Sequence, residues 1–321
     1  IDAREDGLLM KGTLLFLEQI ILQIPGLSGF SFIIGAGENF LELPFQVEMG
    51  SKFKLTFPEI KLTLRLATDL LKPVKQVNGQ YVPDPAKKYI EVSLTLELSI
   101  DGEGNITINK GNQFSLDPAM IGDTGVVIHA AKVALDLSRS ASIPQTAHLG
   151  LPETWVGAVI EQMSIHLPPD LKTNVAPTDF TFKNLVIGSG GFSGRIEANW
   201  KPTYDKQKKA YTGKGAGTLF DMPVGLKQVA LEFKQNALTE SDIHAELLVP
   251  FFDQPVGIDL GLSLDGDFTI ALSKSQTGGA SLNDKGMVTL TLEDILQLNV
   301  AHLSFEKKQG QLQLNLGGSV R

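Results

Sequence analysis

Aliphatic and polar side chains alternate along most of this chain. The clearest run is YIEVSLTLELSI at 89–100, in which aliphatic residues take every second position and Glu, Ser or Thr lies between them. Successive side chains of a β-strand point to opposite faces, so this pattern predicts a strand with one apolar and one polar face. The same alternation returns at 60–66, 163–167, 192–200, 243–249, 256–264, 268–272, 288–292 and 311–316.

Turn-forming residues separate these runs. DGEGN at 101–105, GSGG at 188–191 and DGD at 265–267 are rich in Gly, Asn and Asp, which suit the tight connections of hairpins. The sequence therefore predicts an all-β fold, with antiparallel sheets in a large or tandem β-sandwich-like, or elongated, architecture and at most one or two short helices. Strand and helix both remain open for the segments 14–24 and 152–162.

Two hairpin-like segments resemble each other. LTLELSIDGEGNITI at 94–108 and IDLGLSLDGDFTIAL at 258–272 share two alternating runs around a common Asp-Gly turn. The proline-rich stretch at 166–179 lies between them and resists regular strand pairing. We therefore predict an N-terminal β unit over 1–167 and a C-terminal β unit over 168–321, with one continuous β domain as the alternative.

Composition and charge exclude several classes of function. A hydrophobic fraction of 42% with 20% charged residues favours a folded protein. The net charge of -8 provides no basic surface for a phosphate backbone, so nucleic acid is not an expected partner. The chain has no cysteine, which excludes disulfides and thiolate chemistry. The apolar run at 14–24 contains Glu18 and Gln19 and is too short for a transmembrane helix.

Short motifs assign no catalytic, cofactor-binding or metal-binding residue. Asp101, Glu103 and Asn105 alternate as in the first half of a calcium loop. Ile106 and Asn112, however, stand where such a loop needs Gly and Glu, so a plain hairpin turn is the preferred interpretation. GxSxG and HExxH motifs are absent from the sequence. We expect no cofactor and favour a role other than catalysis.

One aromatic and basic segment, NWKPTYDKQKKAYTG at 199–213, is the candidate recognition surface. Aromatic rings near a basic tip would suit stacking on a sugar or contact with an anionic partner. The alternative is a long hairpin whose aromatic rings pack across the strands while its lysines keep the tip solvated. The candidate residues of this hairpin are Trp200, Tyr204, Lys206, Lys208, Lys209 and Tyr211.

The apolar rows leave several functions open. If they face one another inside packed sheets, the protein is a structural or binding module without enzymatic activity. If the sheets leave a groove, an aliphatic surface would carry a lipid. A row that faces a membrane is disfavoured, because two Trp and four Tyr are too few for aromatic girdles. A polysaccharide-active enzyme is the remaining alternative, although such enzymes usually carry more Trp and Tyr.

The expected partners follow from these alternatives. Unpaired strand edges, such as that of GQLQLNLGGSV at 310–320, offer backbone groups to other protein modules or to copies of this chain. Lipid or glycan would be the partner of a groove or of the aromatic hairpin. The chain begins IDAREDG, so we expect a piece of a longer extracellular, surface or assembly-forming protein.

Overall fold

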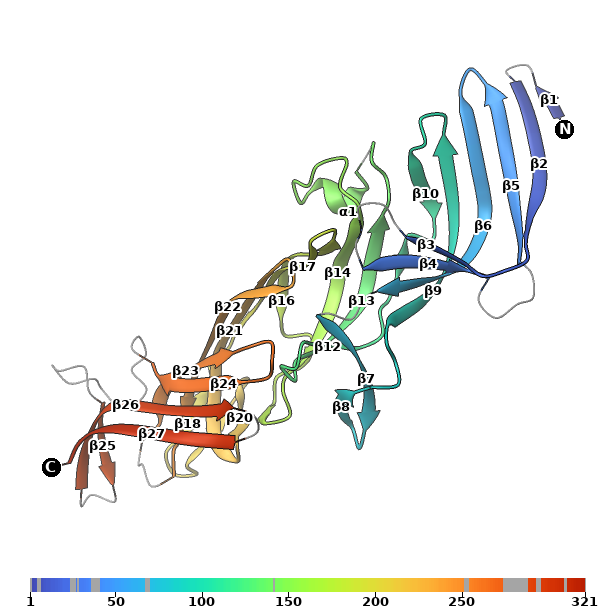
Figure 1. The fold of residues 1–321 in the computed structure, drawn as a ribbon. Helices are drawn as coiled ribbons and strands as arrows, with labels where there is room; N and C mark the ends of the chain where they lie inside the picture. The colour runs from blue at the N-terminus through green and yellow to red at the C-terminus, as the bar shows by residue number, and fades with distance from the viewer. Residues whose placement is uncertain are drawn as a thin grey trace.

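The chain folds almost entirely into antiparallel β-sheets. The computed structural model describes residues 2–4, 7–23, 27, 29–35, 41–66, 70–140, 142–250, 254–273, 288–292, 296–308 and 311–320. Within these residues there are 27 strands and one helix, α1 (Pro144–Ala147). The predicted all-β class is confirmed. The molecule is elongated, with its two termini at opposite ends (Figure 1).

An eight-stranded sheet forms the N-terminal end of the molecule. Its members are β1 (Asp2–Arg4), β2 (Gly7–Phe16), β3 (Ile20–Gln23), β4 (Phe30–Ile34), β5 (Leu41–Gly50), β6 (Phe53–Leu66), β9 (Ile90–Asp101) and β10 (Ile106–Lys110). The long strand β6 is central, with β5 and β4 along one edge and β9 along the other. In the ambiguous segment 14–24, residues 14–16 form the end of β2 and residues 20–23 form β3, so its regular structure is strand among the residues that the structure describes.

The register of β6 and β9 separates an apolar from a polar face. Leu62 lies opposite Leu94 and Leu64 opposite Val92, while polar residues pair with polar residues between them. The apolar side chains of β6 occupy odd positions up to Phe57 and even positions from Ile60, and the pairing register with β9 shifts between these two residues. This β-bulge adds one residue to β6, so the side chains before and after it lie on the same face of the sheet. The apolar face therefore continues along the whole strand.

A 17-stranded sheet forms the rest of the molecule. Most of it is a meander in which strands pair with their neighbours in sequence (Figure 1). The strands are β7 (Leu71–Val77), β8 (Gln80–Pro83), β11 (Gln113–Phe114), β12 (Ala119–Ile121), β13 (Val127–Asp136), β14 (Gly157–His166), β15 (Leu171–Thr173), β16 (Thr181–Gly188), β17 (Gly191–Asn199), β20 (Ala216–Leu219), β21 (Met222–Lys234), β22 (Ala237–Leu247), β23 (Val256–Leu262), β24 (Phe268–Leu272), β25 (Val288–Leu292), β26 (Leu296–Lys308) and β27 (Gln311–Val320).

The 17-stranded sheet answers two questions that the sequence leaves open. The ambiguous segment 152–162 leads into strand β14, and the described helix α1 lies before it. The sheet continues past residue 168, where we expected a boundary, because β14 pairs with β16 through Val159 and Val186. A separate two-stranded ribbon, β18 (Thr203–Asp205) and β19 (Ala210–Thr212), projects between β17 and β20.

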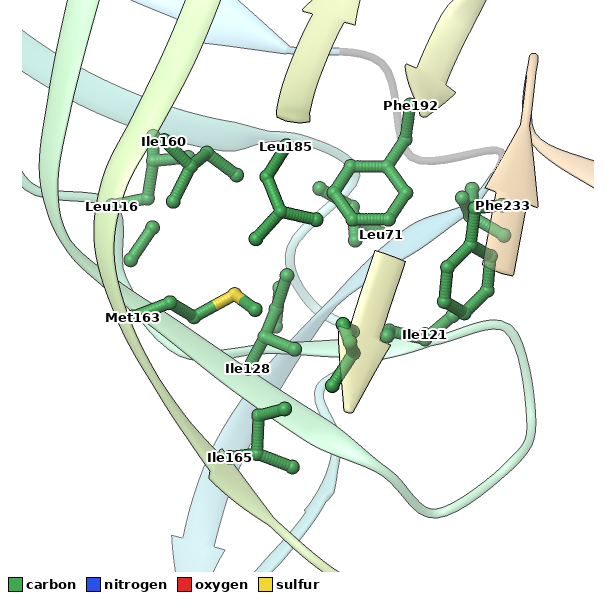
Figure 2. Close-up of a cluster of buried hydrophobic side chains, with 14 of the residues drawn as sticks. Leu71, Leu116, Ile121, Ile128, Ile160, Met163, Ile165, Leu185, Phe192 and Phe233 are labelled. Carbon is green, nitrogen blue, oxygen red and sulfur yellow. The ribbon is translucent and has the colours of Figure 1, made fainter. Parts of the chain in front are cut away.

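One connected cluster of buried apolar side chains extends through both sheets, from Leu27 to Val300. Figure 2 shows its central part, where side chains from β7, β13, β17 and β21 point toward one another. Phe192 and Phe233 pack edge to face there, with ring centroids 5.2 Å apart. Burying each such side chain contributes about 1.5 to 3 kcal/mol, so this cluster is the main source of stability.

A buried carboxylate fixes the loop after β13. Asp136 is almost fully buried, and its carboxylate accepts hydrogen bonds from the Ser138 amide at 3.1 Å and the Thr146 hydroxyl at 2.9 Å. A buried polar group is tolerated only with such partners. Asp136 therefore has a structural role in holding α1 against the end of β13.

Candidate functional site

An apolar cavity of about 240 Å³ lies against the 17-stranded sheet. Its floor is formed by side chains from four neighbouring strands, and the register brings them onto one face. Ile196 of β17 lies opposite Leu231 of β21, and Ile243 of β22 lies opposite both Val229 of β21 and Leu260 of β23. The floor is thus the continuation of the aliphatic face that the sequence pattern predicts.

Three loops form the roof of the cavity. They are the β12–β13 turn at 122–126, the β14–β15 loop at 167–170 and the β20–β21 turn with Phe220. Prolines stiffen the middle loop, and Phe220 has a φ of 50°, which is unusual for a bulky side chain. The roof is therefore built from constrained loops of separate origin.

A contact between two turns closes one side of the roof. The Asp123 amide of the β12–β13 turn donates a hydrogen bond of 2.7 Å to the Leu264 carbonyl in the β23–β24 turn. Gly266 in the latter turn has a φ of 85°, and a Cβ there would lie 2.5 Å from the Asp123 carbonyl oxygen. This close approach joins two parts of the meander that are far apart in sequence, and it requires glycine.

The polar groups of the β12–β13 turn have partners of their own. The buried Thr124 hydroxyl donates to the Ile121 carbonyl at 2.7 Å and accepts from the Val126 amide at 3.0 Å. The Asp123 carboxylate forms an ion pair of 2.7 Å with Lys72. These groups do not need a ligand, so the cavity offers mainly apolar contact.

The structure divides the candidate recognition hairpin into buried rings and an exposed tip. Trp200 is buried, and its ring packs edge to face on Phe180, with centroids 5.4 Å apart. Tyr204 and Tyr211 lie opposite each other in β18 and β19, with centroids 5.3 Å apart. The three lysines Lys206, Lys208 and Lys209 are all exposed at the tip.

Tyr211 is held as a hydrogen-bond donor. Its hydroxyl donates to the Glu246 carboxylate at 3.2 Å, and Lys227 pairs with the same carboxylate at 2.5 Å. Burial, with the nearby negative charge of Glu246, raises the pKa of Tyr211 far above its usual range. The buried rings of Trp200 and Tyr211 stabilise the hairpin and are not available for stacking on a ligand at its surface.

The DGEGN segment forms the predicted hairpin turn between β9 and β10. The Asp101 carboxylate accepts hydrogen bonds of 2.9 Å from the amides of Glu103 and Asn105. The side-chain hydrogen bond from Asn105 is the main reason that the pKa of Asp101 lies below its usual value. In the part of the chain that the structure describes, no cluster of His, Asp and Glu side chains is suited to a metal ion.

The sequence leaves an aliphatic groove open as an alternative, but it does not identify the residues that line this cavity. Alternation places Ile196 and Leu231 on an apolar face, but it does not show that space remains above that face. The only local signals were the Pro168–Pro169 pair and the Gly266 turn, which are also ordinary features of loops.

Comparisons with known proteins add no assignment. No helix among the described residues has the length and apolar character needed to cross a membrane. No protein-family model, curated protein sequence or solved structure matches this chain.

Proposed function

We propose that this protein is a binding module that holds an aliphatic chain, such as the acyl chain of a lipid, in the apolar cavity against its 17-stranded sheet. The observation that carries this proposal is an apolar cavity of about 240 Å³, whose floor is formed by aliphatic side chains of four neighbouring strands. An apolar cavity of about 150 Å³ is enough to bind benzene.

The chemistry of the lining fits such a ligand. The floor consists of Ile, Leu and Val side chains, which contact methylene groups without directional hydrogen bonds. An aliphatic chain would also gain about 0.8 kcal/mol for each methylene group that it buries. A sugar would leave its hydroxyl groups without partners on this surface.

Filling the cavity tests the proposal. Ile243 is half-buried in the cavity lining, so Ile243→Trp places an indole in the space that the ligand would occupy. Ala237→Trp in the same strand is the matched control, because Ala237 is exposed. We expect a fluorescent fatty acid to bind the wild type and Ala237→Trp equally, and Ile243→Trp at least about tenfold more weakly, or about 1.4 kcal/mol.

Circular dichroism would confirm that both variants remain folded. Equal binding by the two tryptophan variants, or the lack of any binding by the wild type, would contradict the proposal.

A second candidate function is that of a structural module that contacts other protein modules. It is favoured by exposed apolar side chains on the N-terminal sheet, among them Leu14 and Phe53. Sedimentation velocity over a wide concentration range tests this candidate. We expect association by the wild type and its loss in a Leu14→Ser, Phe53→Ser double variant, and a monomer at all concentrations would exclude self-association.

A further inference from the structure

A second cavity of about 260 Å³ adjoins the apolar one. The two cavities share part of their walls, including Ile165, Leu167, Leu171 and Phe180. The second cavity is also lined by polar residues that do not line the first. These are Gln80, Tyr81, His166, Lys172 and Thr173.

The alternation of two strands creates this division. Ile165 lines both cavities, whereas His166, the next residue of β14, lines only the second. Leu171 also lines both, and Lys172, the next residue of β15, lines only the second. The apolar lining of the first cavity and the polar lining of the second therefore meet at these two strands.

The polar cavity carries positive charge. None of the residues that line it is Asp or Glu, and Lys172 is its basic residue. Lys172 approaches Asp221 at 3.7 Å, but the two side chains are 67% and 91% exposed. Such an exposed ion pair is weak and is easily exchanged for another anion.

His166 contributes a neutral polar group. Its ring packs edge to face on Tyr81, with centroids 5.0 Å apart. Burial, assisted by the nearby His129, lowers the pKa of His166, so the imidazole is neutral at neutral pH.

The acidic residues near the apolar cavity are Asp123, which pairs with Lys72, and Asp170, which lines that cavity alone.

We infer that the two cavities form one site for a single-chain lipid with an anionic headgroup, with the hydrocarbon chain in the apolar cavity and the carboxylate or phosphate group beside Lys172. The inference rests on the proposed function, because it names the ligand class of the same site. The apolar cavity alone, at about 240 Å³, is smaller than the about 300 to 1,000 Å³ of a typical ligand pocket, so its size suits one hydrocarbon chain.

Titration calorimetry with amphiphiles of equal chain length tests the headgroup. The series is a fatty acid, a lysophosphatidic acid, a fatty alcohol and an alkyltrimethylammonium ion, each below its micelle concentration. We expect one or both anionic amphiphiles to bind at least about tenfold more tightly than the alcohol and the cation, which is about 1.4 kcal/mol. The tighter of the two anions identifies carboxylate or phosphate as the preferred group.

Lys172→Glu is the test variant, and Lys206→Glu at the exposed tip of the β18–β19 hairpin is its charge-matched control. We expect only Lys172→Glu to weaken the anionic amphiphiles, and to leave the alcohol unchanged. Equal binding of all headgroups, with no effect of Lys172→Glu, would overturn this inference while the proposed function stands. If no amphiphile binds, the proposed function fails and the inference fails with it.

Discussion

The N-terminal tip of the molecule and its centre have the same alternating pattern but a different degree of burial. At the tip, Leu14, Met49 and Phe53 lie on the apolar face and are 41%, 41% and 43% exposed. In the centre, Ile196 and Leu226 lie on the apolar face of the 17-stranded sheet and are fully buried. Alternation therefore determines the direction of a side chain, while contacts with other parts of the fold determine whether it is covered.

Strand β6 shows this difference within a single element. Phe53 begins the strand at the exposed tip, and Leu64, near its other end, is 0% exposed on the same face. β4 pairs with β6 only near Leu64, and there the face joins the buried cluster that continues into the 17-stranded sheet. The opposite strand β9 is present along both parts, so strand pairing alone does not explain the burial.

The largest effect that we predict comes from shortening side chains at the two ends of β6. Leu64→Ala should lower the free energy of unfolding by about 2 to 5 kcal/mol, because it removes a buried side chain and leaves a cavity. Phe53→Ala should lower it by less than about 1 kcal/mol, because the Phe53 side chain is already partly in water. Urea unfolding followed by circular dichroism measures both changes. Equal losses of stability would contradict the difference in burial between the two ends of β6.

An intermediate effect is expected at the turn contact that closes the cavity. Gly266→Ala should lower the free energy of unfolding by more than about 1 to 2 kcal/mol. The positive φ is strained for alanine, and the new Cβ would clash with the Asp123 carbonyl oxygen. Gly104→Ala is the control, since Gly104 has a φ of 82° and open space around its Cα. We also expect faster hydrogen exchange of the Asp123 amide in Gly266→Ala alone.

If Gly104→Ala and Gly266→Ala lose the same stability, and the Asp123 amide exchanges at its original rate, the contact between the turns does not hold the roof in place.

The sequence predicts which face of a strand a side chain lies on better than it predicts whether another part of the fold buries that side chain. The run at 89–100 correctly indicates the two-faced strand β9, and DGEGN correctly indicates the hairpin that follows. Both follow from interactions between residues that are close in sequence. The burial of Trp200 depends on Phe180, and the cavity roof depends on the meeting of Asp123 with Leu264. Those contacts join distant segments, and no local pattern encodes them.

The smallest effect is expected on the polar face of the centre, where Arg195 pairs with Glu240 at 2.5 Å and with Glu197 at 3.1 Å. The hydrogen bond from Arg195 is the main cause that lowers the pKa of Glu240. A carboxylate whose pKa is lower in the folded protein adds stability above its unfolded pKa. This stability is lost as the pH falls through the folded pKa, below about 4.3.

We therefore expect the Arg195→Met variant to lose less stability between neutral and acidic pH than the wild type does. Thermal unfolding at neutral and acidic pH measures this difference, with Lys206→Met as a control at an exposed site. A wild type and an Arg195→Met variant with the same pH dependence would show that this ion-pair network contributes nothing to acid sensitivity.

The most direct test of the proposed binding site is photo-crosslinking of the wild type with a fatty acid that carries a diazirine in its chain, followed by peptide mapping. We predict labelling of the strands that form the cavity floor, at Val229–Leu231, Ile243 and Leu260. Excess unlabelled fatty acid should compete for these sites. Labelling confined to the exposed tip around Leu14, Met49 and Phe53 would contradict the account, because it would show binding to any uncovered apolar surface.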